Sequence, residues 1–310
     1  MTFFLPVLQE TSIVLGEVKE ASALDAEPQL TDAEIYLGLS EGAKKLPTDK
    51  FHISYSELVD WLECSHRHKL KHVQKIGGDT GSQHTEYGKI IHDAIEQWLT
   101  GTPFDAEKTK LDIIEGLKKY PDFKGDPVVW GDSVKPIFDE LPKFLTDKLG
   151  DYKVVAAELA LMEPIEKKKD RWFKGFVDAF FEYTYYDKRM KNPEPQKRYL
   201  VCDWKSSDWG WTGEKKRDPM KAMQLVLYKH YISKKFNIPL EQIKCAFVIL
   251  KRTAKPGAHI ELIPVSVGEK AIENALQNVW KMIGSVERNM VIKNRSSCKW
   301  CVYAGTEFCT

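Results

Sequence analysis

Several features that would assign the chain to other classes of protein are missing from its sequence. No apolar run in the 310 residues approaches the roughly 20 that a membrane-spanning helix needs. The mildly apolar residues 1–17 contain no basic n-region and no clear small-residue cleavage site, so we do not expect a signal peptide. We therefore expect a soluble, cytoplasmic protein that makes no membrane contact.

An excess of charge of one sign is also missing. The chain has 46 basic and 45 acidic residues, which gives a formal net charge of +1. Many DNA-binding proteins are strongly basic, so this balance neither supports nor excludes DNA as a partner. The chain contains no GxxxxGKS or GxxxxGKT phosphate-binding loop, so we expect any helicase motor to reside in a separate partner.

The first half of the sequence predicts a helical region. Hydrophobic residues make up 43% of the chain, which is enough for a sizeable core. Residues 1–50 are poorly periodic and are expected to form a partly ordered N-terminal arm. Residues 51–150 are expected to contain a helix capped by Ser54 or Ser56, a flexible glycine loop over 75–82, a helix over 86–99, and further helix broken at Pro121, Pro127 and Pro142.

The second half predicts a sheet. Runs of aromatic and β-branched residues predict strands over 152–161, 172–185, 199–205, 244–251 and 259–265. Helical spacing predicts helices over 219–235 and 269–288. Residues 267–310 combine the last helix with a cysteine-rich tail. This order predicts one α/β domain with a central mixed sheet flanked by helices and a helical N-terminal elaboration.

Two acidic residues lie inside predicted strands. Asp178 follows Gly175-Phe-Val, and Asp203 lies near the end of the next strand, before Trp204 and Lys205. A carboxylate in an apolar strand is costly to bury unless it is paired or binds a cation. Two carboxylates at the same end of neighbouring strands would form an oxygen site suited to Mg²⁺ or Mn²⁺. Because residues two apart in a strand share a face, Asp203 and Lys205 would reach one pocket and Trp204 would point away.

An Asp-x-Lys pair alone is common on protein surfaces. In this chain, however, other motif segments occur before and after it in a fixed order. The chain resembles the RecB-like branch of the PD-(D/E)XK nucleases, which includes stand-alone CRISPR-associated exonucleases and the AddB nuclease domain. Five segments match in order over residues 52–310: Gly88-Lys-Ile-Ile-His92, Glu158, Gly175-Phe-Val-Asp178, Asp203-Trp-Lys205 and Gln224-x-x-x-Tyr228. The resemblance implies a restriction-endonuclease-like fold and a Mg²⁺- or Mn²⁺-dependent deoxyribonuclease. Residues 51–310 would be its nuclease domain and 151–266 its catalytic core.

The resemblance also implies the ligands of the metal. His92, Asp178 and Asp203 would bind it, and Glu158 would be a further ligand or a structural partner. Judged by its own sequence context, His92 could equally be an ordinary helix histidine, and Glu158 a surface strand residue.

The remaining matched residues would support the reaction. Lys205 would activate the water or stabilise the transition state, since an ammonium beside a metal-bound phosphate suits phosphodiester hydrolysis. Gln224 and Tyr228 would position Lys205 and the DNA backbone. Without the resemblance, these two residues could simply pack together one helical turn apart.

The six cysteines are Cys64, Cys202, Cys245, Cys298, Cys301 and Cys309. An intracellular protein is expected to keep its thiols reduced, so we expect metal ligands or core thiols, not disulfides. Four thiolates that include a CxxC pair could hold zinc or an iron–sulfur cluster. One upstream cysteine with three near the C-terminus is similar to the iron–sulfur site of the RecB-like branch. A [4Fe–4S] cluster is therefore favoured, with Zn²⁺ as the alternative, and Cys202 and Cys245 are expected in the core.

Tryptophans and cations follow Lys205 directly. Trp209 and Trp211 could stack on unpaired bases, or they could pack into the protein. Lys215, Lys216 and Arg217 could contact phosphates. We therefore expect DNA as the partner, bound as single strands or at strand ends.

The expected activity is that of an exonuclease in recombination, repair or phage DNA metabolism, in a bacterial, archaeal or phage-infected cell. A structure-specific or restriction-type endonuclease is the alternative enzyme. A catalytically inactive DNA-binding scaffold is the alternative of another class. The sequence is compatible with a recombination or helicase partner and with self-assembly.

Overall fold

A computed structural model of the chain describes residues 51–77 and 81–310. The expected N-terminal arm, residues 1–50, lies outside the described residues. Residues 78–80 of the expected glycine loop lie outside them as well. Within the described ranges, no helix is long and apolar enough to cross a membrane.

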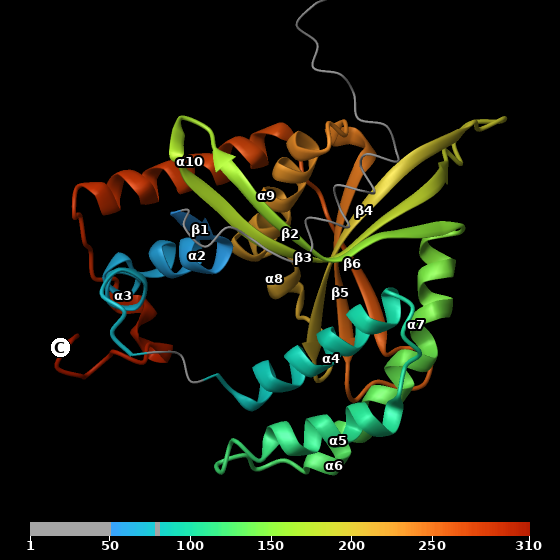
Figure 1. The fold of residues 1–310 in the computed structure, drawn as a ribbon, viewed down its shortest axis with the longest axis horizontal. Coiled ribbons are helices and arrows are strands. Elements are labelled where there is room, and N and C mark those ends of the chain that lie inside the picture. The colour runs from blue at the N-terminus through green and yellow to red at the C-terminus, as the bar shows by residue number, and fades with distance from the viewer. Residues whose placement is uncertain (1–50, 78–80) are drawn as a thin grey trace, which may run out of the picture.

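A six-stranded mixed sheet lies at the centre of the structure (Figure 1). Its strands are β1 (His52–Ser54), β2 (Tyr152–Ile165), β3 (Lys168–Tyr186), β4 (Pro195–Ser207), β5 (Ile243–Lys251) and β6 (Ile260–Val265). β3 pairs antiparallel with β2 along most of its length. On its other side, the N-terminal part of β3 pairs with β1 in a parallel arrangement, and its C-terminal part pairs with β4 in an antiparallel arrangement. β5 joins β4 in parallel and β6 in antiparallel.

Helices cover both faces of this sheet. One face packs against α2 (Tyr55–Glu63), α9 (Pro219–Lys235) and α10 (Glu269–Glu287). The other packs against α4 (Gln83–Leu99) and α7 (Val134–Leu149), and α5 (Ala106–Leu117) packs on these two helices. The shorter helices are α3 (Ser65–His68), the π-helix η1 (Lys69–Val73), α6 (Pro127–Asp132), α8 (Gly213–Lys216), η2 (Leu240–Gln242) and η3 (Arg295–Trp300). The expected mixed sheet flanked by helices is confirmed.

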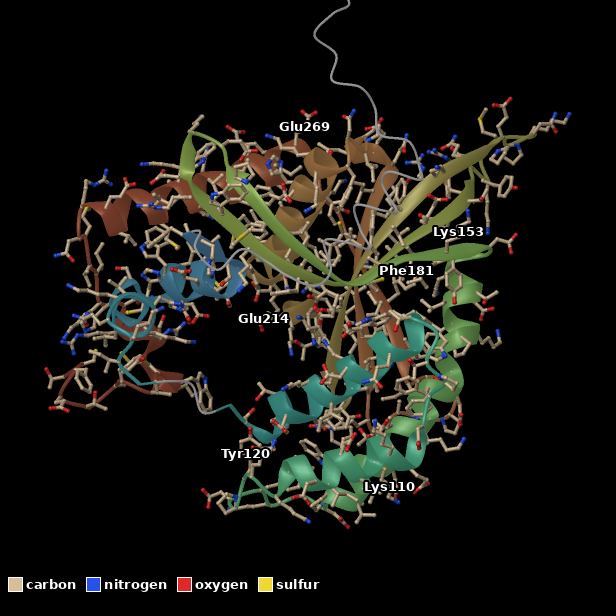
Figure 2. The ribbon with its side chains drawn as sticks, viewed as in Figure 1. Lys110, Tyr120, Lys153, Phe181, Glu214 and Glu269 are labelled. Atoms are coloured by element: carbon tan, nitrogen blue, oxygen red, sulfur yellow. The ribbon has the colours of Figure 1, made fainter. Side chains whose placement is uncertain are left out.

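Alternation along the central strand assigns side chains to the two layers. In β4, Tyr199 and Val201 join the core beneath α9 and α10, whereas Leu200, Cys202 and Trp204 join the core beneath α4 and α7. Buried Phe181 of β3 belongs to the second core, while Lys153 and Glu269 lie on the exposed rim (Figure 2). Both faces are therefore apolar, so a charged side chain within this sheet needs a specific partner.

Local signals set most helix boundaries. Ser54 caps α2 by accepting a hydrogen bond from the Glu57 N–H at 3.2 Å, as expected. Pro127 occupies the first turn of α6, where its missing N–H costs little. The expected break at Pro142 is wrong, because α7 runs through it. The buried apolar side chains of α7, which include Leu141 and Leu145, compensate for the backbone hydrogen bond that proline removes.

Candidate active site

The site lies where β3 and β4 separate. Their pairing ends at Ala179 and Cys202, and β4 then continues beside β5 while β3 continues beside β2. Asp178 and Asp203 are the next residues on the two strands. The Trp204 N–H donates a hydrogen bond of 2.7 Å to Oδ2 of Asp178, so a carboxylate replaces the backbone carbonyl of a regular ladder. The fork thus provides room for two carboxylates inside the sheet.

Asp203 and Lys205 form an ion pair on one face of β4. Lys205 Nζ lies 2.5 Å from Oδ2 of Asp203, whose side chain is only 1% exposed. Oδ1 of Asp203 has no hydrogen-bond partner among the residues that the structure describes. Trp204 between them is buried in the opposite layer, as expected from strand alternation.

The pKa values show how strongly these groups interact. Burial and then the neighbouring Asp203 hold the pKa of Asp178 well above its ordinary value. Burial also raises the pKa of Asp203, and Lys205 opposes this effect. For Lys205, burial alone would lower the pKa, but the attraction of Asp203 and Asp178 outweighs burial and raises it. Two buried carboxylates share one ammonium, so the site favours a further positive charge.

Helix α4 brings a histidine to this fork. His92 Nδ1 lies 3.6 Å from Oδ2 of Asp178. One turn earlier, a Cβ atom on Gly88 would lie 3.3 Å from Ser206 Oγ, so glycine permits the close approach of the helix to β4. Burial and then Lys205 lower the pKa of His92 to about 4. The imidazole is therefore neutral at physiological pH, the form that can bind a metal.

Helix α9 supplies the two residues of the Gln-x-x-x-Tyr segment. Gln224 Nε2 donates a hydrogen bond of 3.2 Å to the Tyr228 hydroxyl. Burial and then Asp203 raise the pKa of Tyr228 above its ordinary value, so the phenol stays protonated beside the carboxylates. Tyr228 packs directly over Gly175, which explains why the strand has glycine three residues before Asp178.

Glu158 faces the same fork from β2. It has a φ of 51° and lies between the paired residues Ala157 and Leu159. A non-glycine residue in this left-handed region is strained, and such strain is often found at functional sites. Burial and then Glu96, Asp93 and Asp203 raise the pKa of Glu158. Glu158 therefore adds a third carboxylate near Asp178.

The side chains of the fork fit a hard divalent cation by their chemistry. Carboxylate oxygens and a neutral imidazole are suitable donors, and a cation would satisfy the orphaned Oδ1 of Asp203. The described parts of the chain contain no three His, Cys, Asp or Glu side chains arranged to surround an ion. In the structure, the ammonium of Lys205 provides the positive charge beside Asp203.

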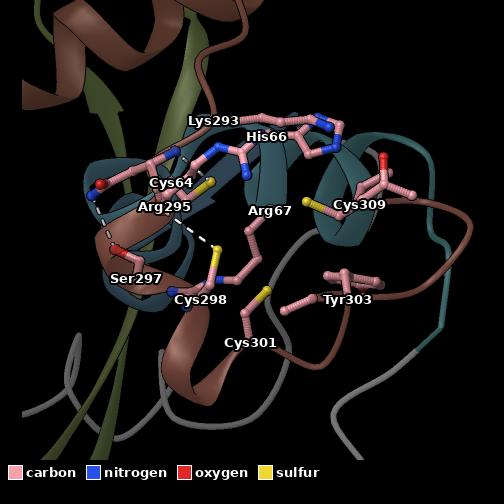
Figure 3. Close-up of a pocket in the computed structure, with 15 residues that line it drawn as sticks. Cys64, His66, Arg67, Lys293, Arg295, Ser297, Cys298, Cys301, Tyr303 and Cys309 are labelled. Carbon is pink, nitrogen blue, oxygen red and sulfur yellow. Dashed lines mark hydrogen bonds between the residues drawn. The ribbon is translucent and has the colours of Figure 1, made fainter.

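A second cluster joins the cysteine tail to the N-terminal helices. Cys64, Cys298, Cys301 and Cys309 all line one cavity of about 180 Å³, and their sulfur atoms point toward a shared space (Figure 3). All six cysteines of the chain are free thiols, and Cys202 and Cys245 are buried on β4 and β5, as expected. The four cysteines that the sequence grouped therefore line one cavity, although no three of these described side chains are arranged to surround an ion.

Hydrogen bonds hold the tail against α2 and α3. The Ile292 N–H donates to Ser65 Oγ at 2.7 Å, and the Asn294 side chain donates to the Glu63 carbonyl at 2.8 Å. The Tyr303 hydroxyl donates to the Ile76 carbonyl at 2.5 Å. The cavity is also lined by the cations Arg67, Lys293 and Arg295. These charges suit a group of thiolates.

The residues after Lys205 divide into exposed and packed ones. Trp209 is 81% exposed, whereas Trp211 is 8% exposed and packs on Phe247 with ring centroids 5.0 Å apart. Of the two alternatives for Trp211, the structure therefore favours packing into the protein, because its ring is buried in the core. Lys216 pairs with Glu261, and Lys215 Nζ lies 4.8 Å above the Trp211 ring. Arg217 is exposed beside them.

Sequence reasoning missed two residues of this region. The Tyr55 hydroxyl donates to the Met220 carbonyl at 2.9 Å, and burial and then Asp203 raise the pKa of Tyr55. Arg252 is 7% exposed and forms an ion pair with Asp208, just after β4. Only long-range packing places these side chains, so no local pattern identifies them.

No curated protein matches the chain. The crystal structure of a “Putative exonuclease” from Eubacterium rectale is similar, with a TM-score of 0.48 and 12% sequence identity over 89% of this chain and 93% of that one. The family model of the PD-(D/E)XK nuclease superfamily matches residues 52–306. This range includes the whole fork with its Asp178, Asp203 and Lys205, and the chain belongs to the PD-(D/E)XK nuclease superfamily.

Proposed function

We propose that this nuclease hydrolyses phosphodiester bonds of DNA as a Mg²⁺- or Mn²⁺-dependent exonuclease that acts on strand ends or single strands. The observation that carries the proposal is the buried Asp203. Its Oδ1 has no partner among the described residues, and it lies beside Asp178 and Lys205 at the strand fork. A buried carboxylate in this state is costly unless a cation completes its surroundings.

Each residue of the fork has a separate task in this proposal. Asp178, Asp203 and His92 hold the metal, and Glu158 supports it from β2. When bound, the divalent ion lowers the pKa of water and polarises the phosphate. Lys205 neutralises charge that develops on the phosphate and orients the attacking water. The hydrogen-bonded Gln224 and Tyr228 fix the surroundings of Lys205 from α9 and contact the DNA backbone.

Digestion of end-labelled DNA tests this function. The purified protein is incubated with linear and circular DNA, each single- and double-stranded, in Mg²⁺, in Mn²⁺ and in EDTA. We expect mononucleotides or short products from linear DNA with Mg²⁺ or Mn²⁺, and no cutting of circles. Cutting of circular DNA would instead identify an endonuclease. Absence of any metal-dependent cleavage would favour an inactive DNA-binding scaffold.

We further propose that Cys64, Cys298, Cys301 and Cys309 hold a [4Fe–4S] cluster that ties the C-terminal tail to α2 and α3. The supporting observation is their common cavity of about 180 Å³. A single zinc ion, with Zn–S bonds of about 2.3 Å, needs less space. Anaerobic purification tests the cluster: a brown protein containing iron supports it, and a colourless protein containing zinc contradicts it.

The biological setting follows from the activity in this proposal. A nuclease without a motor motif acts alone or follows a separate helicase or recombination protein. DNA recombination, repair or phage DNA metabolism would supply its linear substrates. Sedimentation of the protein with and without DNA would show whether copies assemble.

A further inference from the structure

A tryptophan projects into solvent directly after the catalytic strand. Trp209 is 81% exposed, and it lies four residues beyond Lys205 in the turn that follows β4. Exposing a large aromatic ring to water forgoes the free energy that its burial would provide. Two residues later, Trp211 is buried against Phe247. The same short segment therefore buries one tryptophan and presents the other.

The turn that carries Trp209 is closed by its own hydrogen bonds. The Gly210 N–H donates a hydrogen bond of 3.2 Å to Ser207 Oγ. The Ser207 hydroxyl in turn donates a hydrogen bond of 3.0 Å to the Gly210 carbonyl. Gly210 has a φ of 111°, which favours glycine. A Cβ atom there would also lie 3.2 Å from the Lys251 side chain. Ser207 and Gly210 thus fix the backbone on both sides of Trp209.

The start of the loop after β5 clamps the same turn from outside. The Arg252 N–H donates to the Ser207 carbonyl at 3.0 Å, and the Arg252 guanidinium pairs with Asp208. The Thr253 N–H and hydroxyl donate to the Asp208 carbonyl at 3.1 and 2.7 Å. Arg252 is itself held, since its guanidinium carbon lies 3.6 Å from the centroid of the Trp130 ring. These contacts therefore fix the backbone of the turn that carries the exposed Trp209 ring.

Trp209 is also at a suitable distance from the chemistry. The four residues from Lys205 to Trp209 would span about 13 Å if fully extended, at about 3.3 Å each, and the turn after Ser207 shortens this distance. The ring is therefore at most about four base steps from Lys205, at about 3.4 Å each. We propose that Trp209 is a stacking platform for a nucleobase of the bound strand, and that it makes the site select single-stranded DNA or a frayed end. The inference rests on the proposed function, because it takes DNA as the substrate.

Base stacking explains why the selection favours unpaired strands. Every base has an aromatic face, so a tryptophan platform binds without regard to sequence. In a duplex, both faces of an internal base are already covered by its neighbours, and opening the stack costs free energy. A platform close to Lys205 therefore favours strands whose bases are free.

Equilibrium binding in EDTA tests the platform separately from cleavage. Fluorescence anisotropy compares a labelled single strand with the matching blunt duplex. We expect Trp209→Ala to weaken single-strand binding by about 5- to 150-fold, since one stacked base contributes about 1–3 kcal/mol. Duplex binding should not change, and Trp209→Phe should restore most of the single-strand affinity. Tyr186→Ala is the matched control, because Tyr186 is 50% exposed at the far end of β3.

Two outcomes would overturn the inference. One is a Trp209→Ala protein that binds the single strand as tightly as the unchanged protein. The other is an equal loss of single-strand and duplex affinity, which would indicate a general backbone contact. Asp208→Asn tests the clamp, and unchanged single-strand affinity would show that the fixed turn is irrelevant. Failure of the proposed function would be distinguishable, because the unchanged protein would then bind DNA but cleave none with Mg²⁺ or Mn²⁺.

Discussion

A Cβ atom on Gly175 would lie 2.6 Å from Cε1 of Tyr228, closer than any real contact allows. The glycine of the Gly-Phe-Val-Asp segment is therefore matched to the tyrosine of α9. This fit brings α9 down onto β3 and places the Tyr228 hydroxyl near the carboxylates.

Gly175→Ala should displace Tyr228 from this position. We expect a loss of about 1–3 kcal/mol in the free energy of unfolding, as for other overpacked core sites. Nuclease activity should fall as well, because the Gln224–Tyr228 pair would no longer support Lys205. Urea denaturation and a cleavage assay measure the two effects. The control is Gly268→Ala, since a Cβ atom there meets nothing within 4 Å. Equal stability of the two variants would refute the steric match.

Substitution of Lys205 should abolish cleavage and spare DNA binding. We expect Lys205→Ala to slow hydrolysis at least about 100-fold, as for a lost proton-transfer or charge-stabilising group. The same change leaves Asp203 buried without its ammonium, which could also disturb the fold. Lys205→Arg is therefore the second variant, because arginine keeps the positive charge beside Asp203 but cannot exchange a proton. Asp203→Ala should also be inactive.

Initial rates with Mg²⁺ and affinities in EDTA separate the two effects. Lys135→Ala serves as the control, because Lys135 is an exposed residue of α7 paired with Asp139. Full activity of Lys205→Ala would contradict the assignment of Lys205, whereas full activity of Lys205→Arg would show that its charge alone is needed.

Loss of Cys64 should release the tail. Cys64→Ser is expected to lose visible absorption and iron together, and to unfold at lower temperature, because the cluster would no longer join residues 298–309 to α2. Cys245→Ala should keep its iron, since this thiol is buried on β5 away from the cavity. Iron analysis and thermal melting measure both. Normal iron content in Cys64→Ser would remove Cys64 from the ligand set.

Acid should weaken the contact between α2 and η1 through Asp60. Burial raises the pKa of this carboxyl, but hydrogen bonds from His72 and Lys71 and the charge of Arg67 outweigh burial and lower it to about 2. A depressed folded-state pKa stabilises the fold above the unfolded value of about 4, and this contribution is lost as the pH falls toward 2. The shift corresponds to about 2 kcal/mol.

The free energy of unfolding should therefore fall less between pH 6 and pH 2.5 in Asp60→Asn than in the unchanged protein. Asp139→Asn is the control, because Asp139 forms an exposed pair on α7. Identical pH profiles for the unchanged protein and Asp60→Asn would exclude this linkage.

Elements with strong local signals were predicted well from the sequence. The helix over 219–235 has the observed bounds, because Asp218 caps it and Pro219 occupies its first position. Strands were found, but β3 begins at Lys168 and β4 at Pro195, earlier than expected. These ends are polar segments that pair with neighbours, and cross-strand pairing leaves little trace in the sequence of one strand.

The structure brings the predicted residues Asp178, Asp203 and Lys205 together, but their geometry could not be predicted from the sequence. Asp178, Asp203 and Lys205 were identified because a carboxylate inside an apolar strand is conspicuous. The fork that separates β3 from β4, the left-handed backbone of Glu158 and the approach of Tyr55 all depend on residues distant in sequence. Trp211 shows the same limit, since nothing in its neighbourhood distinguishes it from the exposed Trp209.

The hydrogen bonds between the tail and α2–α3 have a consequence for the order of folding. Residues 292–303 leave the ribosome more than 200 residues after Glu63 and Ser65. Their Ile292 and Asn294 donate hydrogen bonds to oxygen atoms of these two residues. The segment after α2 therefore cannot reach its final arrangement before residues 292–303 have been made. A nascent chain halted before residue 292 would carry Cys64 without its three companions. The cysteine cavity can therefore assemble only after synthesis has passed Cys309.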